Sequence, residues 1–318
     1  MLVHAATVVD GAHVDASPGA ALLEFDDSPP AGDAMSCRVI AAGSPESIGA
    51  VADATRVRLA GHTIVPSLVN AHSHLDLTHI GPRPFAAAGG SASASAGTAA
   101  ATSDGTFAGW AAFVRSNRAT TDRAIAASVD RGIELSRAGG VAAVGDIAGM
   151  RSPVPLARQR AAGLRGVSFI EIFGVGRRQA AAIDAMREIA AGWNNAAPSD
   201  VDGSTALPPI AVCGLQPHAP YSCGTEVFVA AGELGERTGV PLATHLAETL
   251  EELEFAEHGT GPLAGLLREV GAWDESIRPW GAHPVEALAG AACPRPLARG
   301  PPQLCRSDAH RDPRATCA

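Results

Sequence analysis

The chain has 318 residues, of which 46% are hydrophobic, and a formal net charge of −9 at pH 7. The apolar content excludes a disordered chain and is sufficient for a large core, while the acidic balance argues against nucleic acid and anionic membranes as partners. Residues 1–5 lack a basic segment leading into an apolar stretch, and no apolar run approaches the ~20 residues of a membrane span. We therefore expect a cytoplasmic protein.

Residues 1–63 contain short runs that are typical of β-strands, separated by clusters of Gly, Pro and Asp. The runs cover residues 6–9, 20–25, 38–41 and 57–59. They predict a small β subdomain at the N-terminus.

From residue 64 the pattern changes, and short apolar runs alternate with segments of helix length. Such alternation is typical of parallel strands joined by crossover helices. It predicts an α/β fold over residues 64–291, namely an incomplete (β/α)₈ TIM-type barrel with about five strands. The predicted barrel strands are residues 64–70, 141–147, 166–173, 210–216 and 240–245. Residues 86–104 and 194–207 are predicted to be loops.

Residues 292–318 show no periodicity and include five prolines. Proline supplies no amide donor for a central strand, so this tail is predicted to be unstructured. The abrupt change of composition near residue 291 indicates a frameshift or truncation, which would leave an out-of-frame tail.

The first candidate site is the sequence His72-Ser73-His74, which ends an apolar run. Residues i and i+2 of a strand point to the same face, and the carboxyl ends of barrel strands carry active sites. Two neutral imidazoles placed in this way can bind a divalent metal ion. A chance occurrence of the same pattern is the competing interpretation.

Two further histidines follow predicted strands. His245 closes the run 240–245 and is followed by Glu248, which either moves protons beside a metal or simply opens the next helix. His218 follows the run 210–216, where an ordinary loop histidine is the alternative. The acidic residues after Glu248 are predicted to form a solvated helix face; they are Glu251, Glu252, Glu254 and Glu257.

The segments PSLVNAHSHLDL, LQPHAPYS and THLAETLEELEF together resemble the amidohydrolase superfamily. They are most similar to the deaminase and chlorohydrolase branch, which contains S-adenosylhomocysteine deaminase and aminodeoxyfutalosine deaminase. The resemblance runs from about residue 40 to about residue 290. It implies a metal-dependent hydrolase acting on C–N bonds.

The resemblance also implies roles for individual residues. His72, His74 and His245 would bind one divalent ion, expected to be Zn²⁺, with Fe²⁺ or Mn²⁺ as alternatives. Glu248 would carry a proton from the attacking water to the leaving amine, and His218 would contact the substrate. Glu171 and Asp146 end predicted strands, where pocket-lining and purely structural roles both stay open.

The implied reaction is hydrolytic deamination of an aminopurine-type or related heterocyclic small molecule, and a homo-oligomer stays open. Alternatives are hydrolysis of a cyclic amide or of a chloro-substituted ring on the same scaffold, and a non-catalytic pseudogene remnant. The family's histidine after strand six and aspartate after strand eight have no counterparts here. We therefore expect impaired activity and weak metal retention.

Overall fold

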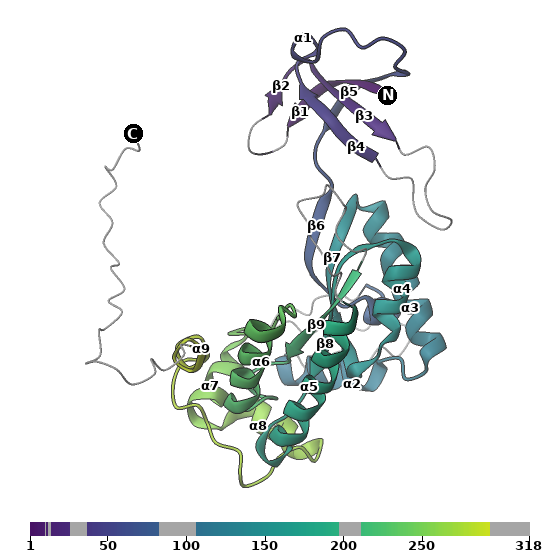
Figure 1. The fold of residues 1–318 in the computed structure, drawn as a ribbon. Helices are drawn as coiled ribbons and strands as arrows, with labels where there is room; N and C mark the ends of the chain where they lie inside the picture. Colours follow the sequence, from purple (N-terminus) through teal and green to yellow (C-terminus); the bar gives the residue numbers. More distant parts are fainter. Residues whose placement is uncertain (10, 12–13, 26–36, 83–105, 197–210, 293–318) are drawn as a thin grey trace, which may run out of the picture.

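The computed structural model describes residues 1–9, 11, 14–25, 37–82, 106–196 and 211–292. These residues form two separate β-sheets. The strands up to residue 64 form the first sheet, and the strands from residue 68 onward form the second. In Figure 1 the N-terminal sheet lies at one end of the molecule, and the parallel sheet with its helices forms the larger part. The predicted loop at 86–104 and nearly all of the tail at 292–318 lie outside the described residues.

The N-terminal sheet has five strands, and β1 (Leu2–Val9) is central to it. β1 pairs antiparallel with β2 (Asp15–Ala16) and β3 (Gly19–Phe25), and parallel with β5 (Arg56–Ile64). The sheet is completed by β4 (Cys37–Gly43), which pairs with β3 and is followed by the short helix α1 (Pro45–Ile48). The predicted strands are present here, and most are longer than the sequence runs.

The second sheet consists of four parallel strands in sequence order. They are β6 (Leu68–Ser73), β7 (Val141–Ala148), β8 (Arg165–Ile172) and β9 (Ala211–Pro217). Each pair is parallel throughout, so their carboxyl ends lie at one edge of the sheet. This agrees with an α/β fold, although the described residues do not form a closed barrel.

Helices connect the parallel strands as the alternating pattern predicts. The crossover helices are α2 (Phe107–Asn117) and α3 (Asp122–Ala138) before β7, α4 (Val154–Ala162) before β8, and α5 (Gln179–Ala196) before β9. A 3-10 helix, η1 (Leu75–Ile80), follows β6 directly. α5 extends over the first residues of the predicted loop at 194–207, and the rest of that loop lies outside the described residues.

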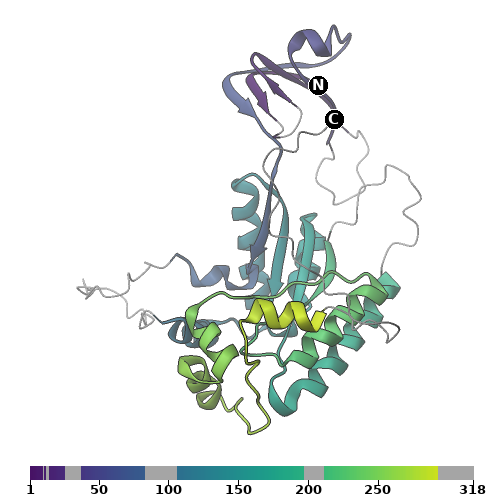
Figure 2. The same ribbon diagram turned by 90° about the vertical axis from the view of Figure 1, so that its left-hand side faces the viewer.

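Four more helices follow β9. They are α6 (Thr225–Thr238), α7 (Leu250–His258), α8 (Gly261–Glu269) and α9 (Pro284–Ala292). Figure 2 shows α9 crossing in front of the other helices, where it contacts α6 and α7. No helix within the described ranges has the length and apolar character needed to cross a membrane.

The prediction of a fifth barrel strand at residues 240–245 is wrong in its extent, because only a single bridge between Leu215 and Leu242 forms. The Leu215 amide donates to the Pro241 carbonyl, and the Ala243 amide donates back to Leu215. To extend the ladder toward the carboxyl ends, residue 217 would have to donate its amide. To extend it toward the amino ends, residue 241 would have to donate its amide, and both residues are prolines. Proline has no amide donor, so the ladder stops on both sides.

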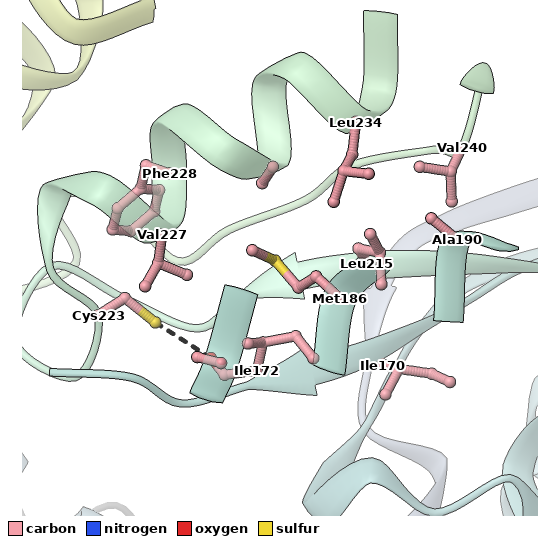
Figure 3. Close-up of a cluster of buried hydrophobic side chains, with 12 residues drawn as sticks. Ile170, Ile172, Met186, Ala190, Leu215, Cys223, Val227, Phe228, Leu234 and Val240 are labelled. Carbon is pink, nitrogen blue, oxygen red and sulfur yellow. Dashed lines mark hydrogen bonds between the residues drawn. The ribbon is translucent and has the colours of Figure 1, made fainter. Parts of the chain in front are cut away.

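The largest core cluster lies between the parallel sheet and helices α5 and α6. Figure 3 shows Met186 of α5 beside Leu215 of β9, with Val227 and Leu234 of α6 directed at the same space. Met186, Leu215 and Val227 are fully buried. This packing fixes β8 and β9 relative to the helices, and with them the loops that leave the carboxyl ends of both strands.

Asp146 on β7 is a fully buried carboxyl group that two donors hold in place. Its Oδ1 accepts the Leu75 amide at 2.8 Å, and its Oδ2 accepts the Gln159 side-chain amide at 2.9 Å. Burial is the main cause that raises the pKa of Asp146 to about 7, because loss of solvent disfavours the charged form. Its contacts support the structural alternative.

We expect the free energy of unfolding of Asp146→Asn, minus that of the unchanged chain, to increase as the pH rises from about 4 to about 7. In this window the folded carboxyl group keeps a proton that the unfolded chain releases, so the unchanged chain loses stability as the pH rises. The asparagine does not titrate. It can still accept from Leu75, and after a half-turn of the Gln159 amide it can donate to Oε1 of Gln159, which lacks a partner among the described residues.

Urea unfolding of both forms at about pH 5 and about pH 8 measures this effect. All other titrating groups are shared, so the difference between the two curves isolates Asp146. Identical pH dependence of the two unfolding free energies would show that the carboxyl group titrates normally.

Candidate metal centre

Three histidines from two distant segments meet at the carboxyl edge of the parallel sheet. His72 lies on β6, His74 directly follows that strand, and His245 follows the bridged segment beside β9. One ring nitrogen from each of the three lies within 4.8 Å of the others. The ring centroids are 5.0 to 5.6 Å apart. The structure therefore brings together the three residues predicted to bind a metal.

Two of these imidazoles, those of His74 and His245, are held in the form that binds metals. Burial first, and then the neighbouring His245, lowers the pKa of His74 to about 3. Burial and the neighbouring His72 lower the pKa of His245 to about 4. Both rings are thus neutral near pH 7 and offer a lone pair, as a zinc ligand must. Nδ1 of His74 is buried and has no partner among the described residues, so the donor set fits a divalent ion.

A second group of potential ligands contains His245 again, together with Glu171 and His218. Arg118 lies 3.2 Å from Glu171, and its positive charge disfavours a cation there. Nδ1 of His218 is 2.6 Å from the Ser222 hydroxyl, which occupies that nitrogen. Within the described residues, no member of the first group is paired with an arginine in the way that Glu171 is, so we regard Glu171 and His218 as cavity walls.

A cavity of about 880 Å³ opens beside the histidines, and its walls are mainly apolar. Both residues predicted to contact substrate, Glu171 and His218, line it, and so does Glu248. The His218 ring lies 4.5 Å from the Phe173 ring, at an angle of 31°. Aromatic side chains on α2 form another wall; they are Phe107 and Trp110. The space has the form of a small-molecule site.

Glu248 lies in the turn between His245 and α7. Burial and the neighbouring Glu252 raise the pKa of Glu248, so its carboxyl group holds a proton more readily than an exposed glutamate. The alternative that Glu248 opens the helix is not what the structure shows, because Thr249 is the N-cap and α7 begins at Leu250.

The prediction of a solvated acidic face on α7 is wrong for two of its four residues. Glu252 is fully buried. Glu251 is partly buried, and its carboxylate accepts the amides of Phe107 and Ala108 at the start of α2. The helical spacing could not reveal this, because the partners of Glu251 lie more than 140 residues away.

Arg118 is a cavity residue that the sequence did not point out. It lies at the end of α2, and its guanidinium is 3.2 Å from Glu171 and 3.4 Å from Asp76. Asp76 and Glu171 are almost completely buried, and Arg118 is 13% exposed. No local pattern connects them, since the pairing depends on how α2 packs against β8 and η1.

Gln216 contacts one of the three histidines: its side-chain Nε2 lies 3.1 Å from Nδ1 of His245. Its Oε1 is buried without a partner among the described residues. Amide oxygen and nitrogen are exchanged by a half-turn of the group. After that turn, Oε1 would accept a hydrogen bond from a protonated Nδ1 of His245 and leave Nε2 of the ring with a lone pair.

Gln216→Met is therefore expected to weaken zinc binding by about 10- to 100-fold, the usual cost of losing a partner of a metal ligand. Methionine keeps the length of the side chain but cannot fix the protonation of the ring. Chelator competition measures the affinity, and thermal unfolding of the metal-free form is the control for folding. Unchanged zinc affinity would show that Gln216 only fills space.

Known proteins with similar sequences are deaminases, although no family model matches the chain. The chain is 26% identical over 226 residues to 5-methylthioadenosine/S-adenosylhomocysteine deaminase of Symbiobacterium thermophilum, covering 70% of this chain and 46% of that protein. It is 36% identical over 72 residues to 5'-deoxyadenosine deaminase of Methanocaldococcus jannaschii, covering 22% and 17%. The chain thus spans about half the length of the first relative, and its match to the second covers a smaller share of that protein.

Solved structures share the fold. Helicobacter pylori aminofutalosine deaminase in complex with methylthio-coformycin gives a TM-score of 0.61 at 17% identity, covering 88% of this chain and 59% of that one. The zinc complex of atrazine chlorohydrolase from Arthrobacter aurescens gives 0.59 at 15% identity, covering 92% and 58%. Together with the named relatives, they confirm the predicted resemblance to the deaminase branch of the amidohydrolase superfamily.

Proposed function

We propose that this chain supplies the metal-binding and proton-transfer residues of a hydrolytic deaminase of the amidohydrolase superfamily, acting on an adenosine-like nucleoside. The observation that carries the proposal is the meeting of three histidines, two of them held neutral by burial, beside a carboxyl group of raised pKa. The named relatives act on adenosine-type nucleosides. A cavity with aromatic walls adjoins this group.

His72, His74 and His245 would hold the ion, for which zinc is the best match to a set of neutral imidazoles. When bound, the ion would supply Lewis-acid activation of water. Gln216 would keep the His245 ring turned toward the ion.

Glu248 would take a proton from the attacking water and deliver it to the departing amine. A general acid–base group works best when its pKa lies near the working pH. Partial burial and the charge of Glu252 move the pKa of Glu248 upward, in that direction. Glu248 and His245 both line the cavity, which supports this role.

His218 and Phe173 would orient the heterocycle. The Ser222 hydroxyl donates to the Ala219 carbonyl, so its oxygen accepts from Nδ1 of His218. Nε2 of His218 is then an acceptor for the amino group of the substrate. Phe173 offers an aromatic surface beside it. Glu171, held by Arg118, would lie behind this acceptor, 3.7 Å from Nε2.

A comparison of two leaving groups tests the proposal. The zinc-loaded chain is incubated with 5'-deoxyadenosine, with methylthioadenosine and S-adenosylhomocysteine, and separately with atrazine. We expect ammonia and the inosine-type product from at least one nucleoside, no chloride from atrazine, and no reaction in metal-free samples. Chloride release without ammonia would favour the chlorohydrolase alternative, and no ammonia from any nucleoside would contradict the proposal.

A further inference from the structure

We propose that Glu252 is a positioning residue, which sets the direction of the Glu248 carboxyl group by holding the backbone turn that carries it. The inference rests on the proposed function, because it assigns Glu248 to proton transfer. Glu252 itself is fully buried and is not among the residues that line the cavity.

The contacts of Glu252 are directed at one short stretch of backbone. Its Oε1 accepts the Ala247 amide at 2.9 Å, and its Oε2 accepts the Glu248 amide at 2.8 Å. The two oxygens of one carboxylate therefore accept hydrogen bonds from two consecutive backbone amides. Hydrogen bonds to a charged acceptor are stronger than neutral ones, so this pair of bonds fixes the turn well.

The carboxylate is itself anchored in the first turn of α7. The Glu252 amide donates to the Thr249 hydroxyl at 3.2 Å, which makes Thr249 the N-cap of the helix. A glutamate three residues after such a cap usually reaches back to the amide of the cap residue. Here it reaches one and two residues further back, to the amides of Glu248 and Ala247.

Ala247 shows why the turn needs to be held. Its φ is +55°, in the left-handed region that residues with a side chain rarely adopt. Consecutive amides around such a residue point to the same side and form a concave anion site. The Glu252 carboxylate fills that site. Without it, Ala247 would relax toward ordinary backbone angles, and Glu248, the next residue, would turn away from the cavity that it lines.

A purely structural role as a helix cap is the competing explanation. It predicts a loss of stability without any dependence on Glu248. A positioning role predicts that replacing Glu252 matters for the site only while Glu248 keeps its carboxyl group. The two effects should then fail to add, which a double-mutant cycle measures.

The cycle uses the full zinc-loaded chain as unchanged protein, Glu252→Gln, Glu248→Gln and the double variant, with methylthio-coformycin as the probe ligand. We expect Glu252→Gln to weaken probe binding by about tenfold and to have no further effect in the Glu248→Gln background. Zinc stoichiometry should stay unchanged. The matched control is Glu257→Gln, the same change at an exposed position of α7. Equal losses in both backgrounds would overturn the inference.

Amide hydrogen exchange provides a readout that needs no ligand. We expect exchange at Ala247 and Glu248 to be at least about tenfold faster in Glu252→Gln than in the unchanged chain, and unchanged in Glu257→Gln. Unaltered exchange would overturn the inference even if the probe bound well. Failure of the unchanged chain to bind the probe would instead contradict the proposed function, and exchange would still decide whether Glu252 holds the turn.

Discussion

His245→Ala is expected to lose zinc binding almost completely. The loss of affinity should exceed the roughly 10- to 100-fold that follows from removing a residue that hydrogen-bonds a metal ligand. His245 joins the group from a segment far along the chain, and its removal leaves two ligands on one strand end. Two imidazoles fall short of the three protein ligands that a catalytic zinc site uses alongside water. Zinc content after dialysis against a chelator, together with a competition titration, measures the loss.

His258→Ala is the matched control, because His258 is an exposed histidine on α7 whose nearest charged partner is Glu257. It should bind zinc as the unchanged chain does. Stoichiometric zinc in His245→Ala after the same dialysis would mean that the ion is held elsewhere. The proposed role of His72, His74 and His245 as the metal ligands would then be wrong.

Glu248→Gln is expected to lower the rate of ammonia release by about 10²- to 10⁴-fold, the usual contribution of a positioned acid–base group. Glutamine has nearly the same shape but cannot exchange a proton. Zinc affinity should not change, since Glu248 is not a member of the ligand group. Initial rates at saturating nucleoside, with zinc content measured on the same samples, separate proton transfer from metal binding.

Glu257→Gln again serves as the control and should keep the full rate. If Glu248→Gln also kept it, another group would have to move the proton, and the arrangement of Glu248 and Glu252 would be structural only. A loss of zinc together with the rate would show instead that the Glu248 carboxyl group helps to bind the ion.

Local sequence was sufficient to find the histidines. His72 and His74 are two apart at the end of an apolar run, so the period of a strand alone places them on one face. Parallel strands end at one edge of a sheet, which brought His218 and His245 into the same prediction. The boundaries of β6 to β9 follow from the same apolar runs to within a few residues.

Local sequence failed where contacts depend on distant partners. Residues 240–245 have the composition of a strand, but the ladder stops because Pro217 on β9 and Pro241 supply no amide donors. Glu251 has the spacing of a solvated helix face, yet its carboxylate accepts the amides of Phe107 and Ala108. A charge pattern along one helix contains no information about what packs on it.

The sequence by itself determined the α/β class and the parallel strands, because strand periodicity is a local property, and the family resemblance pointed to the three histidines. Only the tertiary structure decided which groups control those residues. Arg118 at the end of α2 meets Glu171 of β8, Gln216 of β9 contacts His245 after the bridged segment, and Glu252 accepts the amides of the turn that carries Glu248. Hydrogen bonds and ion pairs form between groups that folding brings together, and distance along the chain does not encode them.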